Sequence, residues 1–175
     1  MQVVTNGIVP DVGEVSIEDL IEDEEIIVSV SSNGYVKSVP STSYKKQGRG
    51  GKGVKAASSD EDVIEHLLST SVHSYLLFFT DQGKVYRAKA HEIPKTNRTA
   101  RGSLIQNVLS MGQDEKVQAI IDTRDYETEK FLLIMTEKGT VKKSKFKEFD
   151  SNYKSLQAIK LKDDDRVVSV KTTSG

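Results

Sequence analysis

Three stretches of the chain, IIVSVSSNGYVKSV at 26–39, LLFFTDQGKVYRAK at 76–89 and LLIMTEKGTVKKSK at 132–145, share one pattern. Each has an apolar run, polar residues, a glycine, and an outgoing run in which valine is followed by cations. The shared glycines stand where a β-hairpin turn needs a positive φ, and Asn33-Gly34 is the strongest short-range signal for a tight two-residue turn. The sequence therefore predicts three repeats, each with a hairpin at Gly34, Gly83 or Gly139.

A further apolar run follows each hairpin, in IEHLLSTSV at 64–72, VQAIIDT at 117–123 and VVSVKTT at 167–173. β-Branched and aromatic residues dominate these runs, which predicts an all-β fold of propeller-like blades. The second and third hairpins enter through runs that are apolar at nearly every position, as in strands buried on both faces. The expected divisions are an acidic lead-in at 1–25, with a short helix capped by Ser16, and blade repeats at 26–72, 73–128 and 129–175. The last division includes the start of a further repeat, so the expected ring is incomplete.

Charge alternates along the chain although the net charge is −1. Asp and Glu outnumber Lys and Arg by eight over residues 1–25, whereas Lys and Arg are in excess by six over 26–55 and again over 130–162. A smaller basic excess covers 81–101. A solvated mixed surface would intersperse the two signs, so the sorting favours a basic face that recurs with the repeat. Such a face suits the phosphates of nucleic acid.

The segment YKKQGRGGKGVKAA, which follows the first hairpin, holds four of the twelve glycines. Glycine lets the backbone approach a partner closely and offer N–H groups to phosphate oxygens, while nearby cations add attraction. A nucleotide-binding P-loop is excluded because Lys52 is followed by Gly53 rather than by Ser or Thr. A flexible connector with incidental charge is the simpler alternative. The corresponding connectors NRTARGS at 97–103 and NYKS at 152–155 are cationic too, but they are not rich in glycine.

The heptapeptide QGRGGKG at 47–53, after the NGYVKSVP hairpin, closely resembles the gyrase A box, which usually reads QRRGGRG. HSYLLFFTDQGKVYRAKAHEIPKTNRTARG in the second repeat and KGTVKKSKFKEF in the third also resemble the C-terminal domain of DNA gyrase A. The resemblance covers nearly the whole chain. It implies a β-pinwheel, a ring of typically six blades that wraps duplex DNA around a basic rim and so supports negative supercoiling.

The resemblance implies that the seven residues of the box contact DNA. The cations that recur with the repeats are expected to extend this DNA-binding surface. The predicted DNA-binding residues are Gln47, Gly48, Arg49, Gly50, Gly51, Lys52, Gly53, Lys37, Lys45, Lys46, Arg87, Arg98, Arg101, Lys142 and Lys143. One departure is Gly48, where the family usually has arginine. Lys45 and Lys46 stand next to it and can compensate for the lost charge. Binding to duplex DNA is expected to tolerate sequence, because phosphate contacts position a duplex without reading its bases.

Catalysis is not expected of this chain. The three histidines fall in unrelated repeat positions without the spacing of metal ligands or of a nucleophile and its base, so no metal or cofactor is predicted. The resemblance places the chain in a non-catalytic part of an ATP-dependent type II topoisomerase, with the rest of gyrase A and gyrase B as partners. Without cysteine, a signal peptide or a long apolar run, the expected location is the cytoplasm, away from membranes.

Two alternatives remain. The C-terminal domain of topoisomerase IV uses related blades, but its box is usually degenerate or absent. A propeller that serves as a scaffold for other proteins would present an exposed apolar patch and would leave the periodic cations unexplained. The acidic lead-in has two interpretations as well: it is a linker strand, or it is a mimic that competes with DNA for the basic rim.

Overall fold

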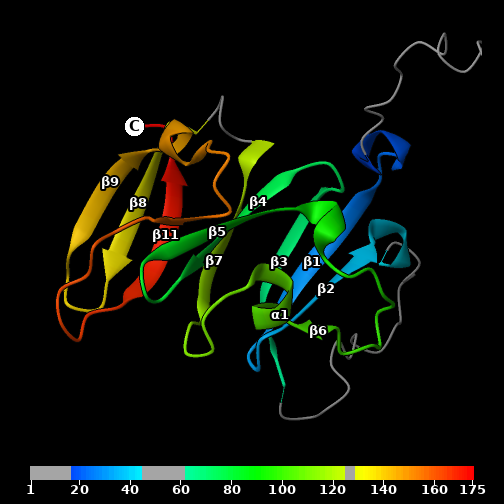
Figure 1. Cartoon of the computed structure of the whole chain (residues 1–175), viewed down its shortest axis with the longest axis horizontal. Coiled ribbons are helices and arrows are strands. Elements are labelled where there is room, and N and C mark those ends of the chain that lie inside the picture. The colour runs from blue at the N-terminus through cyan, green and yellow to red at the C-terminus, as the bar shows by residue number, and fades with distance from the viewer. Residues whose placement is uncertain (1–16, 45–61, 125–128) are drawn as a thin grey trace, which may run out of the picture.

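The computed structural model describes residues 17–44, 62–124 and 129–175, and its strands form three separate sheets (Figure 1). The acidic lead-in and the first two repeats contribute η2 (Ile17–Leu20), β1 (Glu25–Ser31), β2 (Tyr35–Pro40), η3 (Ser41–Ser43), β3 (Ile64–Ser71), β4 (Tyr75–Thr80), β5 (Lys84–Lys89), η4 (Ala90–Glu92), β6 (Ser103–Leu104), α1 (Ile105–Leu109) and β7 (Val117–Asp122). The third contributes β8 (Phe131–Thr136), β9 (Val141–Lys145), η6 (Phe146–Phe149), β10 (Ser155–Gln157) and β11 (Val167–Thr173). The predicted all-β architecture of blade-like repeats is confirmed.

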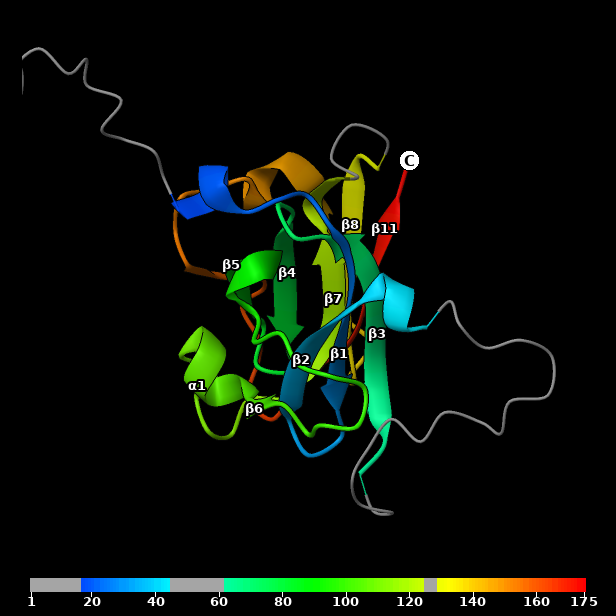
Figure 2. The ribbon, with the colours of Figure 1, turned by 90° about the vertical axis from the view of Figure 1, so that its right-hand side faces the viewer.

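The sheets follow one another, with the second between the other two (Figures 1 and 2). The first sheet has the strand order β3-β1-β2-β6, the second β10-β5-β4-β7 and the third β11-β8-β9. Every strand pairing within them is antiparallel. The third apolar run of each repeat therefore returns to its own hairpin, and β11 completes the third sheet rather than starting another.

Each predicted hairpin is present, with its glycine in the left-handed region at φ +82° for Gly34, +80° for Gly83 and +89° for Gly139. The predicted two-residue turn at Asn33-Gly34 is wrong in length. Three residues, Ser32 to Gly34, separate β1 from β2, and the Gly34 N–H donates to the Ser31 carbonyl at 3.0 Å. A three-residue loop of this kind places a left-handed residue at its last position, which explains the glycine.

Two hydrophobic cores hold the sheets together, one on each face of the second sheet. Leu76 and Phe78 of β4 pack with the first sheet, whereas Leu77 and Phe79 pack with the third. Both faces of β4 are therefore buried, which confirms the interpretation of its continuous apolar run. For β8 the same interpretation is wrong: its residues are alternately buried and partly exposed, because only one face of the third sheet is covered by described residues.

Neighbouring repeats are linked by strand exchange, in which a repeat adds a short strand to the sheet of the repeat before it. The connector of the second repeat provides β6, which pairs with β2 of the first hairpin, and the connector of the third provides β10, which pairs with β5 of the second. Both added strands begin Ser-Leu. Within the described residues, no strand covers the corresponding edge of β9. Val141 there is 60% exposed, whereas its equivalents Val36 and Val85 are 0% and 2% exposed.

The acidic lead-in forms less helix than predicted. The described part contains a four-residue 3-10 helix, η2, followed by an extended stretch into β1. Ser16, the predicted cap, lies outside the described residues.

Candidate nucleic-acid interface

The gyrase-A-box-like segment falls outside the described residues, so the structure does not place Lys45, Lys46 or Gln47 to Gly53. The two described residues that flank the segment, Tyr44 and Asp62, lie beside the first sheet. Tyr44 closes η3, just beyond the end of β2. Asp62 lies at the opposite end of the hairpin, where its carboxylate accepts hydrogen bonds from the Ser32 hydroxyl at 2.9 Å and the Asn33 N–H at 3.0 Å. The segment therefore connects the two ends of the first hairpin.

Two predicted cations lie beside these flanking residues. Arg98 donates to the Ser43 carbonyl at 3.1 Å, and its guanidinium lies 4.9 Å from the centre of the Tyr44 ring. The Arg101 guanidinium lies 4.9 Å from the ring centre of Tyr35. Burial raises the pKa of Asp62, but hydrogen bonds from Ser31, Asn33 and Ser32 and the charge of Arg101 outweigh it, and the net shift is downward. The second connector thus brings Arg98 close to Tyr44 and Arg101 close to Asp62, the described residues that flank the box segment.

The connector has a fixed local shape. The Asn97 side-chain carbonyl accepts the N–H groups of Thr99 at 3.1 Å and Ala100 at 2.9 Å, an arrangement that stabilises a turn. Asn97 and Thr99 are exposed, so this turn stands at the surface. The turn therefore fixes the backbone between Arg98 and Arg101.

Lys37 of β2 holds this connector in place through hydrogen bonds. Its side chain is buried, at 3% exposure, and its ammonium donates to the carbonyls of Arg98 at 2.7 Å and Ala100 at 2.8 Å. Burial, together with the nearby charge of Arg98, lowers the pKa of Lys37. The ammonium is thus used within the chain, in fixing the loop that carries Arg98 and Arg101.

Replacing Lys37 with methionine is expected to lower the free energy of unfolding by about 2 kcal/mol, because two partly buried carbonyls lose a charged donor while the apolar stem stays. Trypsin should also cleave faster after Arg98 and Arg101 once the loop is released. Urea unfolding and timed proteolysis measure the two effects. The exposed Lys171 offers a control, since Lys171→Met should change neither. Equal proteolysis of both variants would contradict this role of Lys37.

Arg87 has the same relation to the third connector. Its guanidinium stacks on the Tyr75 ring at 3.6 Å, donates to the Ser151 carbonyl and lies 3.4 Å from an Asp150 carboxylate oxygen. Its side chain is only 13% exposed. In the first two repeats, then, a cation of the hairpin donates hydrogen bonds to the connector of the following repeat, next to the exchanged strand.

The remaining predicted cations, Lys142 and Lys143 of β9, are exposed. Lys142 donates to the Ala158 carbonyl at 2.9 Å, and the Lys143 ammonium lies 4.2 Å from the centre of the Phe131 ring. The structure adds three exposed cations that the recurrence did not single out: Lys130, Lys145 and Lys147. Pairing of Phe131 with Lys145 and a hydrogen bond from Phe146 to the Lys130 carbonyl bring these lysines to one end of the third sheet.

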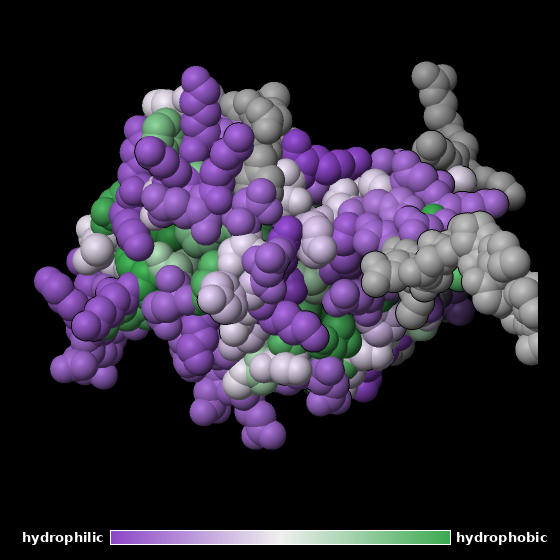
Figure 3. Space-filling model, turned by 45° about the horizontal axis from the view of Figure 1, so that its top comes forward, coloured by the Kyte–Doolittle hydropathy of each residue, from purple (hydrophilic) through white to green (hydrophobic). Residues whose placement is uncertain are grey.

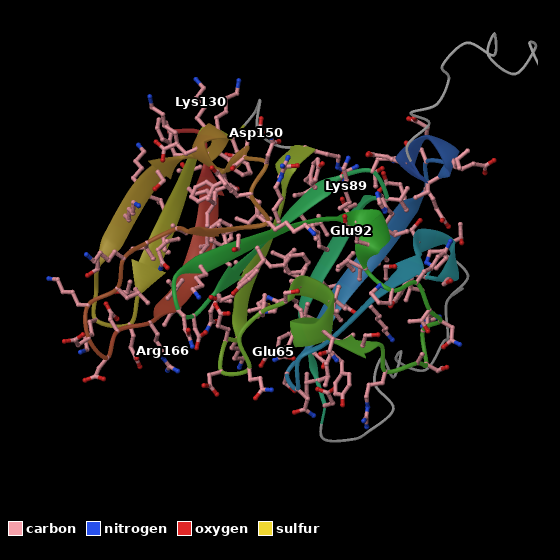
Figure 4. All side chains as sticks on the ribbon, in the orientation of Figure 1. Glu65, Lys89, Glu92, Lys130, Asp150 and Arg166 are labelled. Carbon is pink, nitrogen blue, oxygen red and sulfur yellow. The ribbon has the colours of Figure 1, made fainter. Side chains whose placement is uncertain are left out.

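The end of the third sheet that carries Lys130 is labelled in Figure 4, and hydrophilic side chains cover much of the face shown in Figure 3. The structure groups the predicted cations by sheet: Arg98 and Arg101 on the first, Arg87 on the second, Lys142 and Lys143 on the third. Sequence alone assigned Arg98 and Arg101 to the second repeat. Strand exchange moves them onto the first sheet, beside the ends of the box segment.

Other kinds of site find little support in the described part of the chain. There, three or more His, Cys, Asp or Glu side chains nowhere gather as metal ligands would. The helices described are also too short or too polar to cross a bilayer.

Comparisons with known proteins agree with the repeats. A family model described as the DNA gyrase C-terminal domain, a β-propeller, matches residues 25–74, 74–124 and 130–174. The DNA gyrase A protein of Mycolicibacterium smegmatis is 44% identical over 92% of this chain, and that of Clostridium acetobutylicum is 39% identical over 93%. The alignments cover 19% and 20% of these relatives, so the chain spans about a fifth of their length.

Two solved structures are also similar. The crystal structure of the C-terminal domain of DNA topoisomerase IV superposes with a TM-score of 0.76 at 31% identity, covering 89% of this chain and 47% of that one. The DNA gyrase A C-terminal domain superposes with a TM-score of 0.62 at 28% identity, covering 86% of this chain and 48% of that one.

Proposed function

The chain belongs to the DNA gyrase C-terminal domain family, and from this we propose that it binds duplex DNA and bends it around a basic rim. The supporting observation is the grouping of cations on all three sheets, beside connectors that the preceding hairpins hold in place. These cations would contact phosphates rather than base edges, so binding would tolerate sequence. Bending a duplex costs several kcal/mol, so flexible DNA would be modestly preferred.

The burial pattern divides the predicted cations into two roles. Arg101, Lys142 and Lys143 are exposed and would contact phosphates directly. Lys37 and Arg87 are largely enclosed and hold connectors, so they would act by positioning the residues that bind. The box at Gln47 to Gly53 would provide the closest backbone approach, since four glycines leave its N–H groups open to phosphate oxygens.

In this proposal the chain is a non-catalytic part of a gyrase, and its wrapping of DNA supports negative supercoiling by an ATP-dependent parent enzyme. Its partners there would be the rest of gyrase A and gyrase B, in the cytoplasm. The gyrase A proteins that are about 40% identical to this chain favour this assignment. Topoisomerase IV is the second candidate, because one of its C-terminal domains superposes with a TM-score of 0.76.

A protein-binding scaffold is less well supported. The large hydrophobic side chains that are exposed belong to different elements along the described chain: Leu20, Val63, Leu67, Leu104, Val141, Tyr153 and Val168. Phe131, Leu133 and Met135 of β8 are partly exposed on the face of the third sheet that the described residues leave uncovered, but a scaffold function would leave the recurring cations unexplained.

The proposal is tested by titrating a fluorescent duplex of about 40 base pairs at several salt concentrations, because each neutralised phosphate adds about 0.9 to the log–log slope. The double variant Arg101→Gln and Lys143→Gln is expected to lower the slope by about 2 and to weaken binding equally for unrelated sequences.

A matched control removes two exposed cations that are not among the predicted DNA-binding residues, Lys116 and Arg166, which pair with Glu65 and Glu137. Lys116→Gln with Arg166→Gln changes the net charge by the same amount and should leave the slope nearly unchanged. If the wild-type chain does not bind DNA even at low salt, the proposed function is wrong. If the two double variants behave alike, the assigned rim is wrong.

A further inference from the structure

The acidic segment, defined here as residues 18–25, lies against the second repeat. It carries six carboxylates, on Glu18, Asp19, Glu22, Asp23, Glu24 and Glu25, and neither lysine nor arginine. Three of these side chains pair with cations of other elements. Glu18 pairs with Lys89 of β5, Glu24 with Lys95 at 2.7 Å, and Glu25 with Arg124 at 3.2 Å.

The backbone of the segment is held separately from its carboxylates. The Val72 N–H donates to the Glu24 carbonyl at 3.0 Å, and the His73 Nε2 lies 2.8 Å from the Ile21 carbonyl oxygen. One carboxylate is also held, since the Ser71 hydroxyl donates to the Asp23 side chain at 2.6 Å. In the absence of DNA, these contacts keep the carboxylates close to the cations.

Two of the paired cations, Lys89 and Lys95, lie next to residues of the proposed DNA-binding rim. Lys89 is two residues after Arg87 on β5, and both lie over the same Tyr75 ring, at 4.1 Å and 3.6 Å. A hollow of about 180 Å³ beside them is also lined by Tyr153 and Lys154 of the third connector. Lys89 and Glu92 are labelled in Figure 4 at this end of the second sheet. Lys95 begins the connector that carries Arg98 and Arg101.

The electrostatics favour a carboxylate at this place. The hydrogen bond from Lys89 is the main cause of a lowered pKa at Glu18, and the charges of Lys89, His91 and His73 add to it. The Glu18 side chain is 37% exposed and that of Lys89 is 14% exposed, and the Lys89 ammonium donates both to Glu18 and to the His73 carbonyl, the latter at 3.0 Å. Lys95 and Glu24 are 57% and 38% exposed, and such exposed pairs are weak.

We infer that the acidic segment is an intramolecular competitor of DNA, occupying Lys89 and Lys95 in place of phosphates until a duplex displaces it. The inference rests on the proposed function. A duplex presents a dense row of phosphates and gains by releasing counterions, so it can displace weak exposed pairs one at a time. The segment would therefore lower the affinity for DNA, so that a higher DNA concentration is needed to occupy the second sheet.

The test compares two double variants that change the net charge equally. Glu18→Gln with Glu24→Gln frees Lys89 and Lys95, whereas the control, Glu65→Gln with Glu137→Gln, frees Lys116 and Arg166. At low salt the first is expected to bind a duplex about fivefold more tightly than wild type, and the control within about twofold. Equal tightening of both would mean that net charge alone acts, and no tightening of the first would mean that the segment does not compete. Either result would overturn the inference.

Hydrogen exchange provides a second readout. The Val72 amide, which donates to Glu24, should lose protection when DNA is added to the wild-type chain, and unchanged protection would count against displacement. If the wild-type chain does not bind DNA, the proposed function itself is wrong. If it binds DNA but the two double variants do not differ, only this inference is wrong.

Discussion

Alanine at both Arg49 and Lys52 is expected to abolish the bend that the chain imposes on duplex DNA, while the affinity falls much less. These are the two cations of the Gln47–Gly53 box, and the described residues on either side, Tyr44 and Asp62, connect it to opposite ends of the first hairpin. Bending costs about 1–6 kcal/mol, which must be repaid by contacts at the point of curvature. Cations elsewhere on the rim would still hold an unbent duplex. Energy transfer between dyes on the two DNA ends measures the bend.

The control for this experiment is the double variant Arg101→Ala and Lys143→Ala, which removes the same charge from the first and third sheets. It should weaken binding at least as much and keep the bend in the molecules that remain bound. Energy transfer that persists in the box variant at saturating protein would show that the box does not impose the curvature. Loss of the bend in both variants would show that curvature depends on total charge.

The periodic features of the fold could be predicted from the sequence. Apolar runs, turn glycines and recurring cations indicated three hairpin repeats in an all-β protein. Residues Leu76 to Phe79 are all buried, alternately in one core and the other, which explains the continuous apolar run. The exchange of β6 and β10 could not be predicted, because strands of two and three residues have no readable period. The exposed side of β8 was missed for a related reason: its sequence does not say which neighbour is present.

The site was predictable in residue type but not in role. Lys37 and Lys142 look alike in the sequence, since each stands three residues after a turn glycine, yet Lys37 is 3% exposed and Lys142 lies at the surface. The difference is the exchanged strand, which covers β2 and brings the carbonyls of Arg98 and Ala100 over Lys37. A contact between repeats, rather than a local pattern, therefore decides whether a cation binds a partner or holds a loop.

Replacing Gly83 with alanine is expected to lower the free energy of unfolding by about 3–4 kcal/mol, whereas Gly139→Ala should cost about 1 kcal/mol. Both glycines have a positive φ at the same turn position, so the backbone strain is shared. A Cβ at Gly83 would lie 2.6 Å from the Ile159 carbonyl oxygen, but a Cβ at Gly139 would meet no atom within 4 Å among the described residues.

The difference in unfolding free energy between the two variants measures how tightly the exchanged strand β10 and the residues after it pack against the second hairpin. The Gly83 carbonyl accepts the N–H groups of Ala158 at 2.8 Å and Ile159 at 3.2 Å, just after β10 joins the second sheet. A side chain there would push this junction apart, and nothing described covers Gly139 in the same way. Urea unfolding followed by circular dichroism gives both costs. Equal losses would mean that the close approach at Gly83 relaxes freely, and that the exchanged strand constrains the second sheet less than its hydrogen bonds imply.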